Sequence, residues 1–233
     1  MKVLAIIPAR GGSKGIRHKN IVDFNGRPLL AWSIQAAIDS GVCDEVMVST
    51  EDPNIAEIAC AYGASVPFMR SAELAQDTSK IIECIVEAVQ KYQDQGKHFD
   101  VLILLQPTSP LRTAANIQDA FQLFLRHNRR SLAGVTEAKS PVLMRGLDTQ
   151  NKLSPIAEAQ YSTIRRQDLK KAYAINGAIY INNIQEVNLS LSFNDNEIGF
   201  VMPMKNSIDV DDEEDLLLAK VIGQSLYDAR SKV

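Results

Sequence analysis

Short apolar runs alternate with longer segments of helical spacing through much of the chain. The runs at 3–7 and 101–105 are apolar throughout and too short for helices, so they predict strands buried on both faces. Strands are also expected at 45–49, 131–136, 178–181 and 197–203, and helices at 28–40, 53–62, 78–89, 113–125 and 211–226. This alternation predicts right-handed crossovers and an α/β fold with a doubly wound, mostly parallel sheet.

The regular alternation fails between residues 138 and 173. This stretch is polar, contains Pro141 and Pro155, and carries several basic residues. A connection this long without structure of its own is usually functional or packed against a partner chain. Because 233 residues suit one large domain, we expect a single domain over 1–233 with an inserted dimerisation and substrate arm at 138–173.

The composition of the chain limits the kinds of molecule that it can bind. The net charge is −3, so the chain lacks a general basic field for binding nucleic acid or an anionic membrane surface. No segment approaches the roughly 20 apolar residues needed to span a bilayer. Cys43, Cys60 and Cys84 cannot all pair and lack metal-ligand spacing, so we expect free thiols and a cytoplasmic protein.

Ligands of doubly wound sheets bind beyond the carboxyl ends of the strands. The loops after Ile7, Leu105 and Thr136 are therefore expected to line one site. The first loop, 8–20, combines three glycines with four cations, namely Gly11, Gly12, Gly15, Arg10, Lys14, Arg17 and Lys19. Glycines let backbone amides approach an anion and the cations attract it, so this loop predicts phosphate binding rather than a solvated basic surface.

Two common phosphate motifs do not fit this loop. A Walker A sequence requires GxxxxGK[ST], and Lys14 lies at the wrong position for it. The dinucleotide fingerprint GxGxxG is also absent, and no long helix begins at the glycines. The loop therefore indicates a nucleotide or other polyphosphate site of a different kind.

A pair of carboxylates near the carboxyl terminus is a second chemical signal. Asp209 and Asp211 are two positions apart, a spacing that puts both on one face of an extended segment. Two hard oxygen anions favour Mg²⁺, which keeps waters and bridges substrate phosphates. The alternative is that both belong to the acidic start of the final helix at 209–215, without a metal.

Four motifs in order resemble one known family. They are the segments at 8–20 (PARGGSKGIRHKN), 106–112 (QPTSPLR), 176–180 (NGAIY) and 207–211 (SIDVD). Together they resemble the acylneuraminate cytidylyltransferases, which include the CMP-sialic acid synthetases and their legionaminate and pseudaminate relatives. The resemblance runs from Met1 to about Leu226 and implies a Rossmann-like nucleotidyltransferase fold, with CTP and a nine-carbon acidic sugar as substrates, Mg²⁺ as cofactor and a homodimer.

The resemblance also implies roles for individual residues. The expected CTP-binding residues are Arg10, Ser13, Lys14, Lys19, Asn20 and Arg70, and the expected sugar-binding residues are Gln106, Arg166, Tyr180 and Phe193. Gln106 would bind either the acidic sugar or the base. Asp209 and Asp211 would bind the metal, and Arg10, Lys19 and Asp211 would act in catalysis. From composition alone, Arg70 could equally form a surface salt bridge, and Tyr180 could be ordinary core.

The implied reaction is attack of the sugar's anomeric hydroxyl on the α-phosphorus of CTP, with release of pyrophosphate. One departure concerns the sugar: relatives that use sialic acid often have Arg two residues before the Asn-Gly pair, and this chain has Ala174. A legionaminate-type sugar is therefore expected to serve at least as well as N-acetylneuraminate. An eight-carbon keto-acid sugar and a catalytically silent nucleotide-binding protein remain the alternatives.

Overall fold

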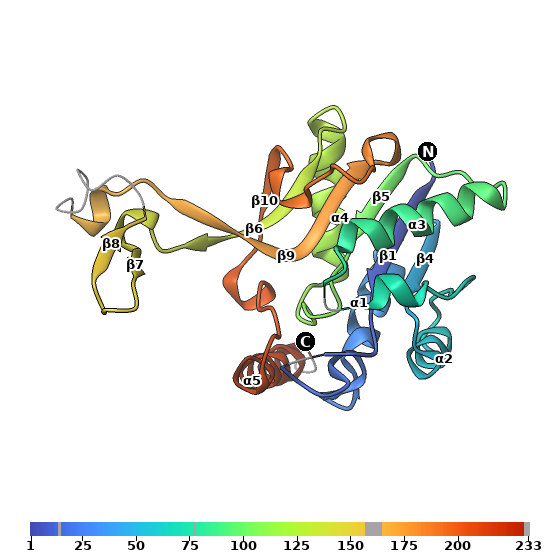
Figure 1. Ribbon diagram of the computed structural model, residues 1–233, viewed down its shortest axis with the longest axis horizontal. Helices are drawn as coiled ribbons and strands as arrows, with labels where there is room; N and C mark the ends of the chain where they lie inside the picture. Colours follow the sequence, from blue (N-terminus) through green and yellow to red (C-terminus); the bar gives the residue numbers. More distant parts are fainter. Residues whose placement is uncertain (14, 77, 157–164, 231–233) are drawn as a thin grey trace.

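The protein is described by a computed structural model over residues 1–13, 15–76, 78–156 and 165–230 (Figure 1). Its main sheet has the order β10-β6-β9-β5-β1-β4. These strands are β1 (Val3–Pro8), β4 (Glu45–Ser49), β5 (Val101–Leu104), β6 (Leu132–Ala138), β9 (Ala172–Asn183) and β10 (Ile198–Val201). Only β9 among them runs antiparallel to its neighbours, β5 and β6, so the expected mostly parallel α/β sheet is confirmed.

Helices cover both faces of the sheet, as a doubly wound fold requires. They are α1 (Leu29–Asp39), α2 (Pro53–Ala61) and α4 (Ala114–Arg126) on one face and α3 (Ile81–Asp94) on the other, whereas α5 (Glu213–Arg230) packs in a separate apolar cluster. Alternate residues of β1 enter opposite cores: Ile7 packs with residues of α1, α2 and α4, whereas Ile6 packs with residues of α3. Both cores are fully buried at β1, which explains the continuous apolar run.

Helix α3 begins later than expected. Thr78 was the expected N-cap, but the cap is Lys80, whose backbone N–H donates to Glu83 Oε2 at 2.9 Å.

The 3₁₀ segments are η1 (Lys19–Ile21), η2 (Ala72–Ala75), η3 (Pro141–Leu143), η5 (Arg166–Asp168), η6 (Ile184–Glu186), η7 (Phe193–Asp195) and η8 (Met204–Asn206).

A third apolar cluster joins the two ends of the chain. Phe24, in the short hairpin of β2 (Asp23–Phe24) and β3 (Arg27–Pro28), packs with Val210 and with Leu216 of α5. This packing places the segment around Val210 beside the loop that follows β1.

The stretch from 138 to 173 is more regular than its sequence indicates. Strands β6 and β9 extend beyond the sheet as a two-stranded ribbon that pairs Ala138 with Ala172. Beyond it, β7 (Arg145–Leu147) and β8 (Leu153–Pro155) form an antiparallel hairpin, and this arm projects from the body of the molecule (Figure 1). The expectation of an irregular segment was therefore wrong. Its strands β7 and β8 have only three residues each, which is too short for an apolar alternation to predict them.

Strand β9 contains a bulge where it crosses the sheet. Its pairing with β6 shifts from Ala133–Tyr180 to Val135–Ile175, so the residues between are not paired with β6. Gly177 in this bulge has φ +69°, a left-handed conformation that favours glycine. The bulge brings the backbone of Gly177 toward the carboxyl end of β5, where a β-carbon on it would lie 2.5 Å from Gln106 Oε1.

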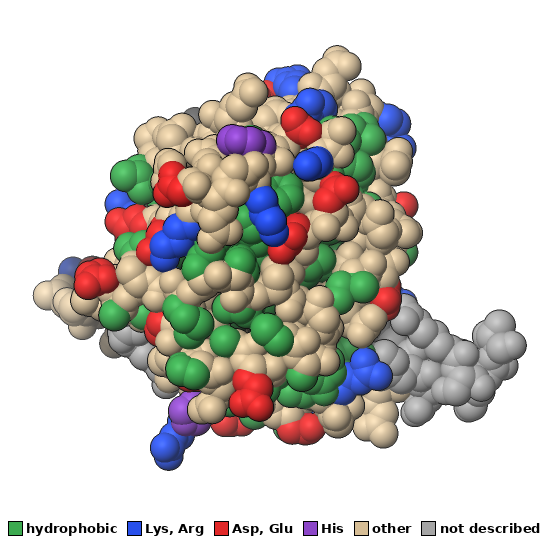
Figure 2. Space-filling model, turned by 90° about the vertical axis from the view of Figure 1, so that its right-hand side faces the viewer, with side chains coloured by type: hydrophobic (Ala, Val, Ile, Leu, Met, Phe, Trp, Pro, Cys, Tyr) green, Lys and Arg blue, Asp and Glu red, His purple; other side chains and the backbone are tan. Residues whose placement is uncertain are grey.

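The surface carries charges of both signs. Figure 2 shows Lys and Arg side chains interspersed with Asp and Glu over one face of the molecule. No helix in the described part of the chain is long and apolar enough to cross a membrane.

Candidate active site

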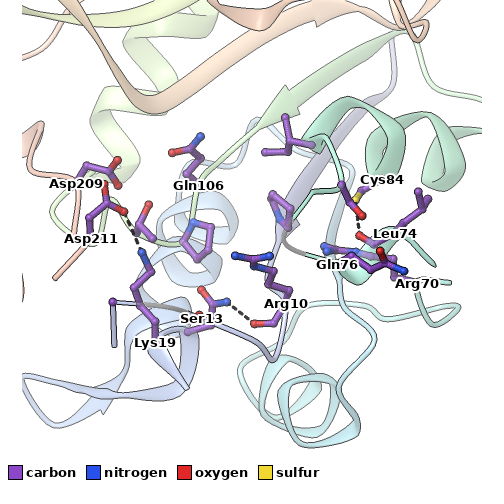
Figure 3. A pocket seen from close by; sticks show the side chains of 17 residues that line it. Arg10, Ser13, Lys19, Arg70, Leu74, Gln76, Cys84, Gln106, Asp209 and Asp211 are labelled. Carbon is purple, nitrogen blue, oxygen red and sulfur yellow. Dashed lines mark hydrogen bonds and ion pairs between the residues drawn. The ribbon is translucent and has the colours of Figure 1, made fainter. Parts of the chain in front are cut away.

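A cleft of about 440 Å³ opens beyond the carboxyl ends of β1 and β5 (Figure 3). Its walls include Arg10, Ser13, Lys19, Asn20, Arg70, Gln106, Thr108, Asp209 and Asp211. The loops after β1 and β5 therefore line one site, as the sheet topology predicts. Lys14, expected beside them, lies outside the described residues.

The loop after β1 presents cationic side chains to this cleft. Figure 3 shows Arg10 in the middle, between the side of Asp209 and Asp211 and the side of Arg70. Asn20 fixes the loop, because its Nδ2 donates to the backbone oxygen of Arg10 at 2.8 Å. The Oδ1 of Asn20 is buried without a protein partner in the described part of the chain.

The opposite wall carries the two carboxylates, on the irregular segment that precedes α5. Lys19 Nζ lies 3.0 Å from Asp211 Oδ1 and donates to the backbone oxygen of Val210 at 2.9 Å. The backbone N–H of Val210 donates in turn to the oxygen of Thr108 at 2.8 Å. Lys19 therefore links the loop at 8–20 (the phosphate loop) to the segment at 207–211 (the acidic segment). Thr108 holds this segment against the end of β5.

Asp209 is a partly buried carboxylate whose Oδ1 is buried and has spare acceptor capacity. Burial raises its pKa above the usual value, and nearby Asp211 adds to the effect, while the Thr108 hydroxyl and Lys19 oppose it. Its Oδ1 has no hydrogen-bond partner among the described residues. A divalent cation would satisfy this oxygen and relieve the repulsion, so the donor set fits Mg²⁺. No group of three or more His, Cys, Asp or Glu side chains in the described ranges is placed to hold a metal ion, so substrate phosphates and water would complete the coordination.

Arg70 forms a rigid part of the cleft wall. It is buried, its Nε donates to Ser49 Oγ at 3.1 Å, and its Nη2 donates to the Ser49 backbone oxygen at 2.5 Å. Glu51 lies 4.0 Å from its Nη1 and accepts from the backbone N–H of Gly11 at 2.7 Å. Arg70 is therefore not the exposed surface salt bridge that its sequence context also allowed.

A second pocket of about 350 Å³ adjoins the first and shares Gln106 and Asp209 with it. Its other lining residues are Thr136, Ile175, Asn176, Gly177, Tyr180, Asn194 and Ser207. The hydroxyl of Tyr180 donates to Asn194 Oδ1 at 3.0 Å. Thr136, the third strand end expected at the site, therefore lines this pocket.

The remaining expected sugar residues differ in their positions. Phe193 is 6% exposed and packs its ring 5.6 Å from that of Tyr180, centroid to centroid, so it supports the pocket from within the core. Phe193 was expected to line the pocket, and this expectation was wrong. The backbone of Arg166 lies in η5 of the arm, but its side chain is outside the described part.

Several pocket residues had no role assigned from the sequence. Thr108 and Ser207 lay inside the 106–112 and 207–211 motifs, and Asn194 lies in a segment whose polarity is ordinary for a surface. Only the shift in the β9 pairing and the packing of the 207–211 segment bring them to the cleft.

Residues 4–205 match the family model for cytidylyltransferases. The chain belongs to the cytidylyltransferase family. It is therefore a nucleotidyltransferase, as the resemblance carried by the four sequence motifs implied. This match covers most of the main sheet and both pockets except the segment that carries the two carboxylates.

Relatives of this cytidylyltransferase act on several acidic sugars. It is 36% identical over 224 residues to pseudaminic acid cytidylyltransferase of Campylobacter jejuni, covering 95% of this chain and 96% of the relative. It is 37% identical over 193 residues to CMP-N,N'-diacetyllegionaminic acid synthase of Legionella pneumophila, with 83% of each chain covered. With N-acylneuraminate cytidylyltransferase of Escherichia coli it shares 36% identity over 226 residues, which are 96% of this chain and 52% of the relative.

A solved structure shares the fold. The synthetase of CMP-2-keto-3-deoxy-manno-octonic acid, complexed with CTP, superposes with a TM-score of 0.71 and 19% identity over 98% of this chain and all of that one. At this identity the likeness establishes the nucleotidyltransferase fold and nothing about the sugar.

Proposed function

We propose that this cytidylyltransferase transfers CMP from CTP to the anomeric hydroxyl of a nine-carbon acidic keto-sugar and releases pyrophosphate. The observation that carries the proposal is the pair of adjoining pockets that share Gln106 and Asp209. One pocket is lined by the phosphate loop, and the other is a polar chamber of different composition. The Campylobacter, Legionella and Escherichia relatives are named for pseudaminic, legionaminic and N-acylneuraminic acids.

The phosphate side supplies positive charge where pyrophosphate leaves. Arg10 and Lys19 line the cleft from one loop, and charge of their sign offsets the negative charge that grows on the leaving group. Ser13 and Asn20 add polar groups that orient the triphosphate, and Lys14 belongs to the same proposal by its place in the loop. Arg70, on the opposite side of the cleft from Asp209, is proposed to contact the cytidine end (Figure 3).

Asp209 and Asp211 are proposed to hold Mg²⁺. The unpartnered Oδ1 of Asp209 and the exposure of Asp211 to the same cleft support this assignment. A bound magnesium ion would neutralise phosphate charge and orient the phosphates. Asp211 also fixes Lys19 through their 3.0 Å contact, so its catalytic role would combine metal binding with placement of that cation.

The sugar side is proposed to be formed by Gln106 and Tyr180. Asp209 is the one charged residue among the described residues that line the second pocket. A sugar carboxylate brought there needs a cation from elsewhere, because a buried anion is costly without a partner. Arg166, from the arm, is proposed to supply it, in its own subunit or in a neighbouring one.

A homodimer is proposed because the arm exposes apolar side chains. Leu147 and Leu153 of the β7–β8 hairpin are 63% and 69% exposed, and Ile156 beside them is 64% exposed. Apolar side chains gathered on a projecting element are typical of an interface between subunits. The cytoplasm is the proposed compartment, since Cys43, Cys60 and Cys84 are all free thiols.

The proposal is tested by pyrophosphate release from CTP and Mg²⁺ with a panel of sugars. The panel comprises N-acetylneuraminate, a diacyl legionaminate, pseudaminate, an eight-carbon keto-acid sugar and no sugar. We expect turnover with at least one nine-carbon sugar and background release without sugar. Preference for the eight-carbon sugar would replace the proposed acceptor, and CTP binding without release in any mixture would indicate a silent nucleotide-binding protein.

A further inference from the structure

Arg112 is a buried cation between the turn after β5 and the bulge of β9. It is 3% exposed, and it lines neither of the two pockets. Its Nη1 donates to the backbone oxygen of Gln106 at 3.1 Å and to that of Ala178 at 2.6 Å. Its Nε and Nη2 are buried and have no protein partner in the ranges that the structure describes.

Burying this charge is costly. Desolvation lowers the pKa of Arg112 to about 9, so the guanidinium remains protonated at neutral pH. A buried cation without a carboxylate beside it destabilises the fold relative to an apolar residue of similar volume. A contribution to fold stability alone therefore does not explain why an arginine is buried at position 112. The two backbone carbonyls that Arg112 binds indicate a different role.

Both carbonyls belong to backbone that shapes the second pocket. The oxygen of Gln106 also accepts from Ser33 Oγ at 3.3 Å, which fixes the turn after β5 from the side of α1. Ala178 lies in the bulge of β9, where its N–H donates to Asn176 Oδ1 at 3.1 Å. Gly177 lies between them, closely packed on the Gln106 side chain. One nitrogen of Arg112 thus bridges two segments that contribute Gln106, Asn176, Gly177 and Tyr180 to the pocket wall.

We infer that Arg112 is a positioning residue for the sugar half of the site. It fixes the Gln106 turn and the β9 bulge relative to each other without touching either substrate. This inference rests on the proposed function. The Gln106 turn borders both pockets, whereas the β9 bulge lines only the second, so loss of Arg112 disturbs sugar binding more strongly than CTP binding.

The test compares Arg112→Met and Arg112→Lys with wild type in the assay of pyrophosphate release, using the most active sugar of the panel. For Arg112→Met we expect the sugar KM to rise about tenfold or more, because a displacement of about 1 Å in a positioned group can cost about 100-fold. The KM for CTP should remain within about threefold of wild type. Arg112→Lys keeps the charge and donates to both carbonyls, so its sugar KM should lie between those of the other two proteins.

Arg129→Met provides the matched control. Arg129 Nη2 also donates to a backbone oxygen, that of Asp100 at 3.3 Å, at the other end of β5. Its loss should lower thermal stability without separating the two KM values. If Arg112→Met fails to fold, Arg112→Lys decides the matter.

Two results would overturn the role of Arg112. One is an unchanged sugar KM in every folded Arg112 variant, and the other is an equal rise in both KM values. Wild-type protein that releases no pyrophosphate with any sugar would instead overturn the proposed function itself, and with it this inference.

Discussion

The α-carbon of Gly15 faces the backbone carbonyl of Asp211 so closely that a β-carbon would overlap its oxygen. Lys19 reinforces the contact by donating to the carbonyl of Val210 at 2.9 Å. The phosphate loop and the acidic segment, which lie at opposite ends of the sequence, are therefore directly packed. Their relative position determines how the cationic and the anionic side of the cleft face each other.

Gly15→Ala should separate these two segments. The added methyl meets backbone, which cannot move aside as a flexible side chain would, so we expect kcat to fall by about tenfold or more. Gly12→Ala is the matched control, because no atom lies within 4 Å of a β-carbon built there. Steady-state kinetics provide the measurement, and a kcat of Gly15→Ala close to the wild-type value would show that the contact with Asp211 is unimportant.

Removing either proposed triphosphate contact should impair turnover while the fold survives. Arg10→Ala and Lys19→Ala are each expected to lower kcat by about 100-fold or more, as loss of one transition-state charge contact does. Arg17→Ala serves as the control, since Arg17 is exposed in the same loop and does not line the cleft. Near-wild-type turnover of Arg10→Ala or Lys19→Ala at saturating CTP and Mg²⁺ would remove that residue from the mechanism.

The metal assignment predicts a contrast between neighbouring acids. Asp209→Asn and Asp211→Asn should abolish activity or raise the Mg²⁺ concentration needed for half-maximal rate, because an amide binds a divalent cation more weakly than a carboxylate. Glu213→Gln should change neither, since Glu213 is exposed at the start of α5. Magnesium titrations of activity provide the measurement. Equal tolerance at all three positions would indicate an acidic helix start without a metal.

Charge placed on the arm should disrupt assembly. Leu147→Asp and Leu153→Asp are expected to convert a dimer into a monomer and to lower activity, because burying an unpaired carboxylate opposes association. Leu189→Asp is the control, as Leu189 is 65% exposed and lies outside the arm. Light scattering at micromolar protein gives the oligomeric state. A wild-type monomer with full activity would contradict the dimer and any contribution of Arg166 to a neighbouring site.

The sugar preference is expected to depend on Ala174. This residue is exposed and pairs with Thr136 of β6, which lines the second pocket, so a longer side chain at this position could reach that wall. A legionaminate-type sugar should serve at least as well as N-acetylneuraminate. One extra buried methyl group contributes about 1 kcal/mol, so we expect at most about a tenfold preference from that contact.

The variant Ala174→Arg tests this expectation through kcat/KM for both sugars. The added cation should shift the ratio toward N-acetylneuraminate. A wild-type enzyme that clearly prefers N-acetylneuraminate, together with an unchanged ratio in the variant, would remove Ala174 from substrate choice. Phe193 offers no additional apolar surface, because it is buried behind Tyr180.

The strands that carry the site were predictable because they are buried on both faces. The apolar runs of β1 and β5 are unbroken and only a few residues long, a pattern typical of central strands in a parallel sheet. The arm was not predictable in detail, since β7 and β8 have only three residues each and β8 ends at Pro155. Strands this short show too little apolar alternation to be recognised from residue types.

The residues of the site were predictable where a short stretch of sequence contains the chemical groups that the site needs. Glycines beside cations in the phosphate loop, and two aspartates at alternate positions, identify side chains that the fold does bring to one cleft. Asn194 and Phe193 show the limit: they are adjacent in sequence, yet Asn194 lines the pocket and Phe193 is in the core. Their orientation depends on η7 and its packing beneath Tyr180, which residue types do not encode.

Phosphorus NMR of one reaction mixture follows both products of the proposed transfer. The mixture contains wild-type protein, CTP, Mg²⁺ and a diacyl legionaminate or N-acetylneuraminate. We expect the three CTP resonances to be replaced by pyrophosphate and a single phosphodiester, in equal amounts and only when sugar is present. Formation of CMP or CDP at the same rate without sugar, or unchanged CTP with every nine-carbon sugar, would contradict cytidylyl transfer to such an acceptor.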